Sequence, residues 1–256
     1  FKMYSTLLIE DMDYISVITI NKPDKLNALG NDVRSELLKA FKHFNEDPNK
    51  RIAILTGKGR AFSAGADLSL NGDSKVDIEE ELSSSFHPLL KEIINSKKIF
   101  ISAINGTAAG AGISLAMACD MVFASKEAKF IMGFQGIGLA PDTGLILILS
   151  RLAGAKIRPY LLFGGNFNGS EASEMGLVNL SGNPLSDAIK TAQKLSRGPY
   201  MAYSTSKLLV NKALYYDMDN FLKDESKLQN ELSATHDFIE GISSFSQKRE
   251  PEFNGM

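Results

Sequence analysis

AINGTAAGAGISLAMACD, residues 103–120, decides the fold, because in it a short apolar strand runs into a turn of small residues and then into a helix. A turn of glycine and alanine leaves backbone N–H groups open to a ligand, since no large side chain covers them. Donors at the start of a helix also carry the positive end of the helix dipole. We therefore interpret this stretch as an anion hole.

The same order of strand, small-residue loop and helix occurs at residues 52–68, where an apolar run leads into GKGRAFSAGAD. Each of the two loops ends in an alanine, Ala66 in one and Ala111 in the other, whose N–H can point into a shared pocket. Two such donors form an oxyanion hole, in which one donor contributes about 3 kcal/mol in a dry site. From these residues alone, tight packing of two small-residue turns remains an alternative.

The composition is that of a soluble globular protein, with 256 residues, 44% hydrophobic and 23% charged, and a net charge of -2. No apolar run is long enough to span a bilayer and no basic excess is present, so we expect neither a membrane nor a nucleic acid as partner. The single cysteine, Cys119, has apolar neighbours and is predicted to be a buried thiol in a reducing compartment. The N-terminal residues lack the features of a signal peptide, which predicts a cytoplasmic location.

Strand-like and helical patterns alternate through most of the chain, which predicts an α/β fold. Residues 4–10 and 14–20 are β-rich runs that indicate a hairpin. Residues 51–56 and 99–104 are short, continuously apolar strands, typical of a parallel sheet covered on both faces.

Two further stretches set the expected organisation of the chain. Residues 70–85 are polar and acidic without a clear period, and they are predicted to form a mobile loop. From residue 184 onward the pattern is almost entirely helical. We therefore divide the chain into a core, residues 1–195, and a helical C-terminal region, residues 196–256.

Three motifs, in this order and spacing, resemble the enoyl-CoA hydratase/isomerase (crotonase) superfamily: FSAGADL at 62–68, INGTAAGAGISLAMACD at 104–120 and IGLAPDTG at 137–144. EGISSFSQKREPEF near the C-terminus extends the match to nearly the whole chain. The resemblance implies a spiral core of repeated ββα units and C-terminal helices that form a homotrimer or a dimer of trimers. It also implies an acyl-CoA substrate whose thioester oxygen is held by the N–H groups of Ala66 and Ala111, with no metal and no permanently bound cofactor.

The chain departs from the hydratases of this family at both catalytic glutamates, where it has Ser114 and Phe134. Neither side chain takes a proton from water at neutral pH, so ordinary hydratase activity is not expected. Asp142, directly after Pro141, stands where the delta-3,delta-2-enoyl-CoA isomerases and epoxyphenylacetyl-CoA isomerases of the family carry their acid. The resemblance therefore implies an isomerase in which one aspartate shifts a double bond or rearranges a ring epoxide.

Several alternatives stay open at this point. Asp142 would have a pKa near 3.9 in water, which an apolar pocket raises towards that of a useful base, but it can also be the N-cap of a helix starting near Thr143. Asp67 and Asp120 are expected to cap or end helices, and His87 is the histidine expected to approach the acyl pocket. The other functions considered are an enoyl-CoA hydratase, a haloaryl-CoA dehalogenase-like hydrolase with Asp142 as nucleophile and His87 activating water, and a non-catalytic acyl-CoA binding protein.

The resemblance also implies contacts with coenzyme A, because family members bind its adenine and phosphates with the first loop and with basic side chains. The residues at the matching positions are Lys25, Ala64, Ala66, Asp67, Leu68, Phe245 and Lys248.

Overall fold

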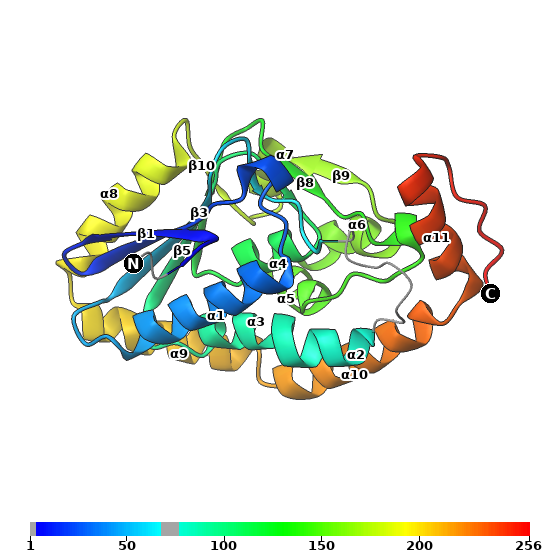
Figure 1. The fold of residues 1–256 in the computed structure, drawn as a ribbon. Coiled ribbons are helices and arrows are strands. Elements are labelled where there is room, and N and C mark those ends of the chain that lie inside the picture. The colour runs from blue at the N-terminus through cyan, green and yellow to red at the C-terminus, as the bar shows by residue number, and fades with distance from the viewer. Residues whose placement is uncertain (1–3, 68–76) are drawn as a thin grey trace.

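Two β-sheets form the centre of the molecule in the computed structural model, which describes residues 4–67 and 77–256 (Figure 1). The larger sheet has the strand order β1-β2-β3-β5-β7-β10 and the smaller has the order β4-β6-β8-β9. The strands are β1 (Leu7–Met12), β2 (Ile15–Ile20), β3 (Ile52–Gly57), β4 (Ala61–Ser63), β5 (Ile99–Ile104), β6 (Thr107–Ala109), β7 (Met121–Ala124), β8 (Lys129–Ile131), β9 (Asn166–Asn168) and β10 (Asn179–Leu180). The α/β prediction is confirmed.

Helices cover both faces of the larger sheet and continue to the C-terminus (Figure 1). They are α1 (Asn31–Glu46), α2 (Ile78–Glu81), α3 (His87–Ile94), α4 (Ala111–Met117), α5 (Leu145–Ala153), α6 (Arg158–Phe163), α7 (Gly169–Glu174), α8 (Pro184–Ser196), α9 (Tyr200–Leu214), α10 (Met218–Ser233) and α11 (His236–Gln247). Short 3-10 turns lie at η1 (Pro23–Lys25), η4 (Gln135–Ile137) and η5 (Gly154–Ile157), and η3 (Leu82–Phe86) is a π-helical turn. The boundary proposed between residues 195 and 196 stays a prediction.

The register of the larger sheet explains its continuous apolar strands. β1 and β2 pair as the predicted antiparallel hairpin, whereas β2, β3, β5 and β7 are parallel. Ile54 of β3 lies opposite Ile101 of β5, and all six residues of each of these strands are buried. The prediction of buried parallel strands is therefore confirmed, and α8 packs on one face of the sheet while α1 and α3 pack on the other.

The predicted mobile loop at residues 70–85 is only partly testable, because residues 68–76 lie outside the described residues. Its second half is helical, which corrects the prediction: α2 begins after Asp77, whose side chain accepts a hydrogen bond from the Glu80 N–H, and η3 follows without a break. Leu82 and Phe86 are buried, and α2 packs beside α10 (Figure 1). This helix could not be predicted from the polar sequence, because it is stabilised by long-range packing and shows no local periodicity.

Three strands lie where the sequence pattern indicated loops or gave no strand, namely β4, β6 and β9. Each is three residues long, too short to show an alternation of period two. Together with β8 they form the smaller sheet, which carries both small-residue loops at its end. The parallel pairing of β4 with β6 brings these two loops side by side.

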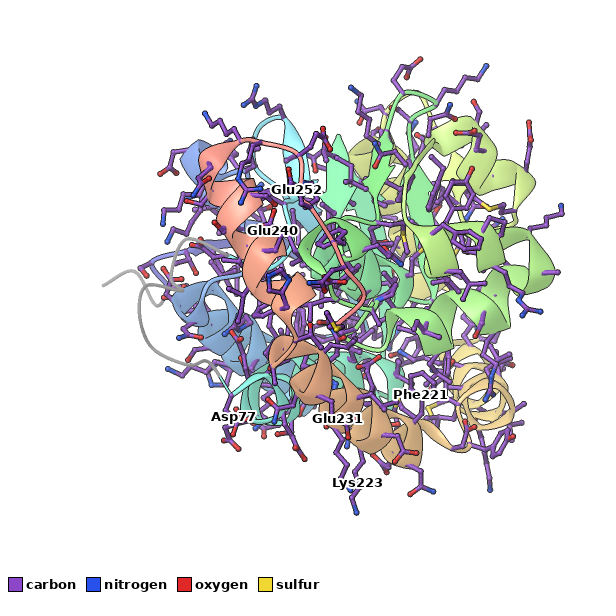
Figure 2. The ribbon with its side chains drawn as sticks, turned by 90° about the vertical axis from the view of Figure 1, so that its right-hand side faces the viewer. Asp77, Phe221, Lys223, Glu231, Glu240 and Glu252 are labelled. Atoms are coloured by element: carbon purple, nitrogen blue, oxygen red, sulfur yellow. The ribbon has the colours of Figure 1, made fainter. Side chains whose placement is uncertain are left out.

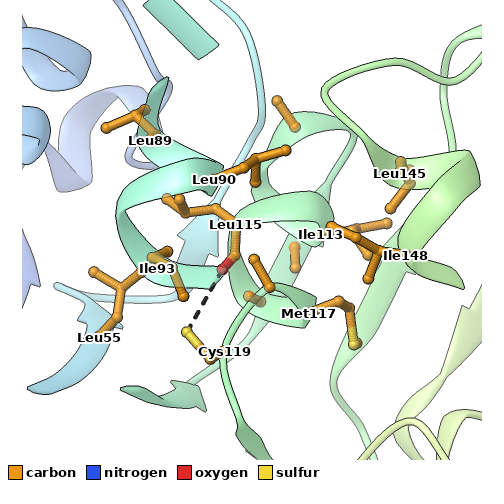
Figure 3. Close-up of a cluster of buried hydrophobic side chains, with 14 of the residues drawn as sticks. Leu55, Leu89, Leu90, Ile93, Ile113, Leu115, Met117, Cys119, Leu145 and Ile148 are labelled. Atoms are coloured by element: carbon orange, nitrogen blue, oxygen red, sulfur yellow. Dashed lines mark hydrogen bonds between the residues drawn. The ribbon is translucent and has the colours of Figure 1, made fainter. Parts of the chain in front are cut away.

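Cys119 is buried in the apolar core just after α4, as predicted (Figure 3). Its thiol donates to the carbonyl oxygen of Leu115 at 3.6 Å, and burial raises its pKa far above the usual value. A deprotonated nucleophile is therefore not available at this position. No helix in the described part of the chain is long and apolar enough to cross a membrane.

Asp120 does not end a helix, which corrects that expectation. Helix α4 ends at Met117, and the Asp120 carboxylate accepts from the Phe100 N–H at 2.8 Å and pairs with Lys207 of α9 at 2.9 Å. The Lys207 ammonium also donates to the backbone carbonyls of Ile93 and Lys98. This buried pair attaches α9 to the sheet and leaves Asp120 with a structural role.

Candidate active site

A cavity of about 1200 Å³ lies where the two small-residue loops meet α2, η4, α10 and α11. Most of its wall is apolar, and its polar groups are few, as is usual for a site that takes a small-molecule ligand. The lining residues are Ala64, Gly65, Ala66, Asp77, Ile78, Glu81, Leu82, Phe86, Ala109, Gly110, Ala111, Ile131, Met132, Gly133, Phe134, Gly136, Ile137, Leu139, Asp142, Asn230, Ser233, Ala234, Phe238, Ile239, Ile242 and Phe245.

Glycines at both loops bring their backbones into contact. Gly65 has φ +83°, and a Cβ placed on it would lie 2.6 Å from the carbonyl oxygen of Ala109. Gly110 has φ +47°, a conformation that favours glycine. Ala66 and Ala111 both line the cavity, and Ala111 is the first residue of α4, so its N–H has no partner within the helix. The loops thus bring the two alanines predicted as donors to one cavity.

Gly65→Ala is expected to lower the free energy of unfolding by about 2 kcal/mol, because a side chain at positive φ is strained and this one also meets the Ala109 carbonyl oxygen. Chemical denaturation measures the change. Gly182→Ala is the matched control, since Gly182 has open space around its Cβ position and is expected to change stability by less than about 0.5 kcal/mol. Equal stability of the two variants would contradict the close contact between the loops.

Asp142 lies on the segment between η4 and α5 and lines the cavity. Its Oδ1 accepts a hydrogen bond from the Thr143 hydroxyl at 2.9 Å, and its Oδ2 accepts from Gln229 Nε2 at 2.8 Å. Helix α5 begins at Leu145, and its N-cap is Gly144, without a side-chain cap. The alternative role of Asp142 as a helix N-cap is therefore wrong.

The pKa of Asp142 is raised to about 7, mainly by burial and in second place by the nearby negative charge of Glu225. The hydrogen bonds from Gln229 and Thr143 act in the opposite direction because they favour the ionised form, while Glu81 adds a smaller rise. Near neutral pH this carboxyl group is therefore present in both protonation states. That is the condition for a group that both takes and returns a proton.

The raised pKa of Asp142 also affects stability. When the pKa of a carboxyl group rises on folding, the group ionises more easily in the unfolded chain. The free energy of unfolding therefore falls as the pH increases from about 4 to about 7. Asp142→Asn removes this loss and is expected to unfold with about 2 kcal/mol more free energy at pH 8, after discounting for the part that faces the cavity. Urea denaturation at pH 4 and pH 8 measures the difference. A gain of the same size at both pH values would contradict the burial effect.

The two positions of the hydratase glutamates lie close to this centre but carry no acid. Ser114 is fully buried, and its hydroxyl donates to the backbone carbonyl oxygen of Asp142 at 3.4 Å. Phe134 lines the cavity beside Gly110. The carboxylates of Asp77 and Glu81 also line the cavity, although Arg34 binds Glu81 at 2.7 Å.

His87 does not line the cavity, which corrects the expectation that it approaches the acyl pocket. Its side chain is buried, and Nε2 lies 3.0 Å from Oε2 of Glu225. A hydrolase in which His87 activates a water molecule against the substrate therefore has no support from this geometry. The other histidines, His43 and His236, are exposed.

The residues predicted to contact coenzyme A divide into three groups. Ala64, Ala66 and Phe245 line the cavity. Lys25 is half-exposed and lies with its Nζ 3.4 Å from Oδ2 of Asp67, beside the first loop. Lys248 is exposed and is the C-cap of α11, and Leu68 lies outside the described residues. The predicted capping of a following helix by Asp67 falls on the same undescribed segment.

Helix α11 packs against η4 with almost no side chains between the two backbones. A Cβ on Gly241 would lie 2.5 Å from the carbonyl carbon of Ile137, and one on Gly138 would lie 2.7 Å from the backbone of Asp237. This contact places Phe238, Ile239, Ile242 and Phe245 of α11 in the cavity wall. Figure 2 shows α11 and α10 on the face that is turned towards the viewer.

Sequence reasoning missed two residues of α10 that act on Asp142. Gln229 donates a hydrogen bond to its carboxylate, and the charge of Glu225 raises its pKa. The signal was present in the helical pattern, because both residues fall on the same stripe as the buried Met218 and Leu222. Polar residues at positions of a buried stripe are uncommon unless they are hydrogen bonded, and they mark a site worth inspecting.

Comparison with known proteins decides the family. A family model described as enoyl-CoA hydratase/isomerase matches residues 10–256. The chain belongs to the enoyl-CoA hydratase/isomerase family. Among relatives, a 1,2-epoxyphenylacetyl-CoA isomerase of Escherichia coli is 32% identical over 249 residues, with 94% of this chain and 95% of the relative covered. A probable enoyl-CoA hydratase of Rhodobacter capsulatus is 35% identical over 257 residues, with 98% and 99% covered.

The fold agrees with this assignment. The crystal structure of an enoyl-CoA hydratase from Mycobacterium avium subsp. paratuberculosis superposes with a TM-score of 0.88 at 30% identity, covering 98% of this chain and 99% of that one. The crotonase-like α/β fold expected from the resemblance is therefore confirmed, and the protein is an enzyme of the enoyl-CoA hydratase/isomerase family. Within the described ranges 4–67 and 77–256, no group of three or more His, Cys, Asp or Glu side chains is placed to hold a metal ion.

Proposed function

We propose that this protein is an acyl-CoA isomerase in which Asp142 is the single acid-base residue and the N–H groups of Ala66 and Ala111 form the oxyanion hole. The observation that carries the proposal is the carboxyl group of Asp142, which lines the cavity with its pKa raised to about 7. Ser114 and Phe134, at the positions of the two hydratase glutamates, offer no second base.

The proposed reaction needs one proton carrier and one anion site. Asp142 removes a proton from the carbon alpha to the thioester, and the charge moves to the thioester oxygen, which the two N–H groups stabilise. The protonated Asp142 then delivers the proton at the gamma carbon, and the double bond has moved by one position. A pKa near the working pH makes Asp142 a stronger base than an ordinary aspartate while a large fraction of it stays ionised, which is why the raised value matters.

An assay of four substrates tests this function. A 3-enoyl-CoA, a 2-enoyl-CoA, an epoxyphenylacetyl-CoA and a saturated acyl-CoA are each mixed with the protein, and products are followed by absorbance and mass. We expect the 3-enoyl-CoA or the epoxide to be isomerised, without addition of water. Binding of all four thioesters without conversion would instead identify a non-catalytic acyl-CoA binding protein.

Hydration of an enoyl-CoA is the second candidate, because the Rhodobacter capsulatus relative is named a probable enoyl-CoA hydratase. In this cavity the water would have to be activated by Asp142 alone, or by Asp77 or Glu81, the other two carboxylates among the described lining residues. The same assay distinguishes the two reactions, since hydration of the 2-enoyl-CoA adds the mass of water and isomerisation adds none. Faster hydration than isomerisation would overturn the isomerase proposal.

We also propose that the protein assembles as a homotrimer or a dimer of trimers. Large apolar side chains on α6 and α9 are exposed in the single chain, among them Phe163 at 81%, Met201 at 77% and Leu209 at 63%. Exposed apolar residues in such number mark association surfaces. Sedimentation of the purified protein measures the assembly, and a monomer at micromolar concentration would exclude it.

A further inference from the structure

Helix α10 presents polar side chains to the interior of the molecule. Its buried stripe consists of Met218, Leu222, Glu225, Ser226 and Gln229. Glu225 is 7% exposed and Gln229 is 1% exposed, although both are polar and one carries a carboxylate. Groups of this kind are costly to bury unless every one of their polar atoms is used.

Both the oxygen and the nitrogen of the Gln229 carboxamide form hydrogen bonds with the segment that carries Asp142. Its Oε1 accepts from the Ala140 N–H at 3.1 Å, and its Nε2 donates to the Ala140 carbonyl oxygen at 2.9 Å. These two backbone contacts fix which end of the amide is oxygen and which is nitrogen. The second N–H of Nε2 then points to Oδ2 of Asp142 at 2.8 Å, and it can only donate.

Glu225 lies one helical turn before Gln229 and is held from two sides. Both of its carboxylate oxygens accept from the Gly144 N–H at 3.0 Å, and Oε2 lies 3.0 Å from His87 Nε2. Gly144 is two residues beyond Asp142, so Glu225 and Gln229 hold the same short segment at its two ends. Neither Glu225 nor Gln229 lines the cavity.

We propose that Gln229 is a positioning residue that holds the Asp142 carboxylate in one orientation at the cavity, with Glu225 behind it as a fixed negative charge. The inference rests on the proposed function, in which Asp142 exchanges a proton with the substrate. Gln229 touches no substrate in this arrangement and acts only through Asp142.

The two α10 residues have opposite effects on the proton affinity of Asp142. The amide donor of Gln229 stabilises the ionised carboxylate and lowers the pKa of Asp142, whereas the charge of Glu225 raises that pKa. Glu81 of α2 is a further carboxylate that raises the pKa of Asp142, and His87 of α3 contacts Glu225 rather than Asp142. Removing one α10 residue at a time therefore moves the pKa in opposite directions.

Carbon-13 NMR of protein labelled at the aspartate carboxyl carbon measures this directly, with Asp142→Asn identifying the resonance. The wild-type carboxyl is expected to titrate near pH 7. Gln229→Met keeps the side-chain length without the donor and moves the midpoint up by about one pH unit, and Glu225→Gln moves it down by about one, as expected for one hydrogen bond or charge at a carboxylate. Asp224→Asn removes a charge from the exposed side of α10 and leaves the midpoint unchanged.

Steady-state kinetics then separates positioning from proton affinity. Two pH units above its own midpoint, each variant has an ionised Asp142, and Gln229→Met is still expected to show kcat about tenfold lower with KM within about twofold, because orientation is lost. Glu225→Gln is expected to recover most of kcat there, since its effect is electrostatic. A Gln229→Met enzyme with wild-type kcat at that pH would overturn the positioning role.

Failure of the proposed function and failure of the inference about α10 give different results in this experiment. If the wild-type protein turns over no thioester, the proposed function fails, and the titrations still decide whether α10 controls the Asp142 carboxyl. Shifts in the same direction for Gln229→Met and Glu225→Gln, or none in either, would overturn the inference. Should Gln229→Met not fold, Gln229→Asn takes its place in both measurements, because its shorter amide does not reach Oδ2 of Asp142, and it is expected to move the midpoint up and lower kcat in the same way.

Discussion

Asp142→Asn is expected to lower kcat for 3-enoyl-CoA isomerisation by about a thousandfold, within the range that loss of a general acid-base residue produces. The amide cannot take the alpha proton. Among the described carboxylates of the cavity wall, Asp142 is the one that Gln229 and Thr143 hold by hydrogen bonds, so another carboxylate is not expected to replace it. Binding of a saturated acyl-CoA is expected to change by less than about threefold, because the oxyanion hole and the apolar wall remain. Stopped assays and isothermal calorimetry measure the two quantities.

The pH profile sharpens this test. Wild-type kcat/KM is expected to rise with pH and to level off above pH 7, since the free enzyme needs an ionised Asp142 whose pKa is about 7. Asp77→Asn is the control, because Asp77 is a cavity carboxylate without a proposed role in the proton transfer. If Asp142→Asn keeps its activity while Asp77→Asn loses it, the base has been assigned to the wrong wall of the cavity.

Ala111→Pro is expected to lower kcat by a factor of about a hundred to a thousand with little change in folding, because proline removes one oxyanion-hole donor. Proline suits the first position of a helix, where the missing N–H has no intrahelical partner, and α8 already begins with Pro184. The rate is measured on the 3-enoyl-CoA, and thermal unfolding reports the fold.

The control for this substitution is His236→Pro, the same change at the first residue of α11. His236 is exposed and does not line the cavity, and the cap before it, Thr235, is already extended as a residue before proline prefers. Wild-type turnover in Ala111→Pro, with unfolding temperatures equal in both variants, would show that the Ala111 N–H does not hold the developing oxyanion.

The strand-loop-helix order of residues 52–68 and 99–118 was predictable because its signals are local: apolar runs, small-residue turns and helix starts. The helices from Tyr200 onward were predictable for the same reason. The three-residue strands β4, β6 and β9 were not, since they exist only through pairing with distant segments. The helical half of residues 70–85 was missed because its stabilising contacts come from α10, more than a hundred residues later.

The residues of the candidate site show the same difference between local signals, which could be predicted, and contacts with distant segments, which could not. Asp142, Ala66 and Ala111 could be named from motifs, and the structure brings all three to one cavity. His87 was placed wrongly because its neighbour Glu225 belongs to another helix, and no pattern within the sequence joins the two. Residues that act through another side chain have no motif of their own, and they become visible only when α10 is packed against the segment that they hold.

The glycine contact between α11 and η4 has a consequence for which acyl groups the enzyme accepts. Because Gly138 and Gly241 let α11 and η4 meet backbone to backbone, the separation of these two adjoining parts of the cavity wall is set by the main chain rather than by side chains. Exchanging Phe238 or Ile242 for smaller residues changes local shape, but it leaves that separation as it is. A larger residue in place of either glycine would instead push α11 away from η4 and so reshape the cavity from a position that does not line it.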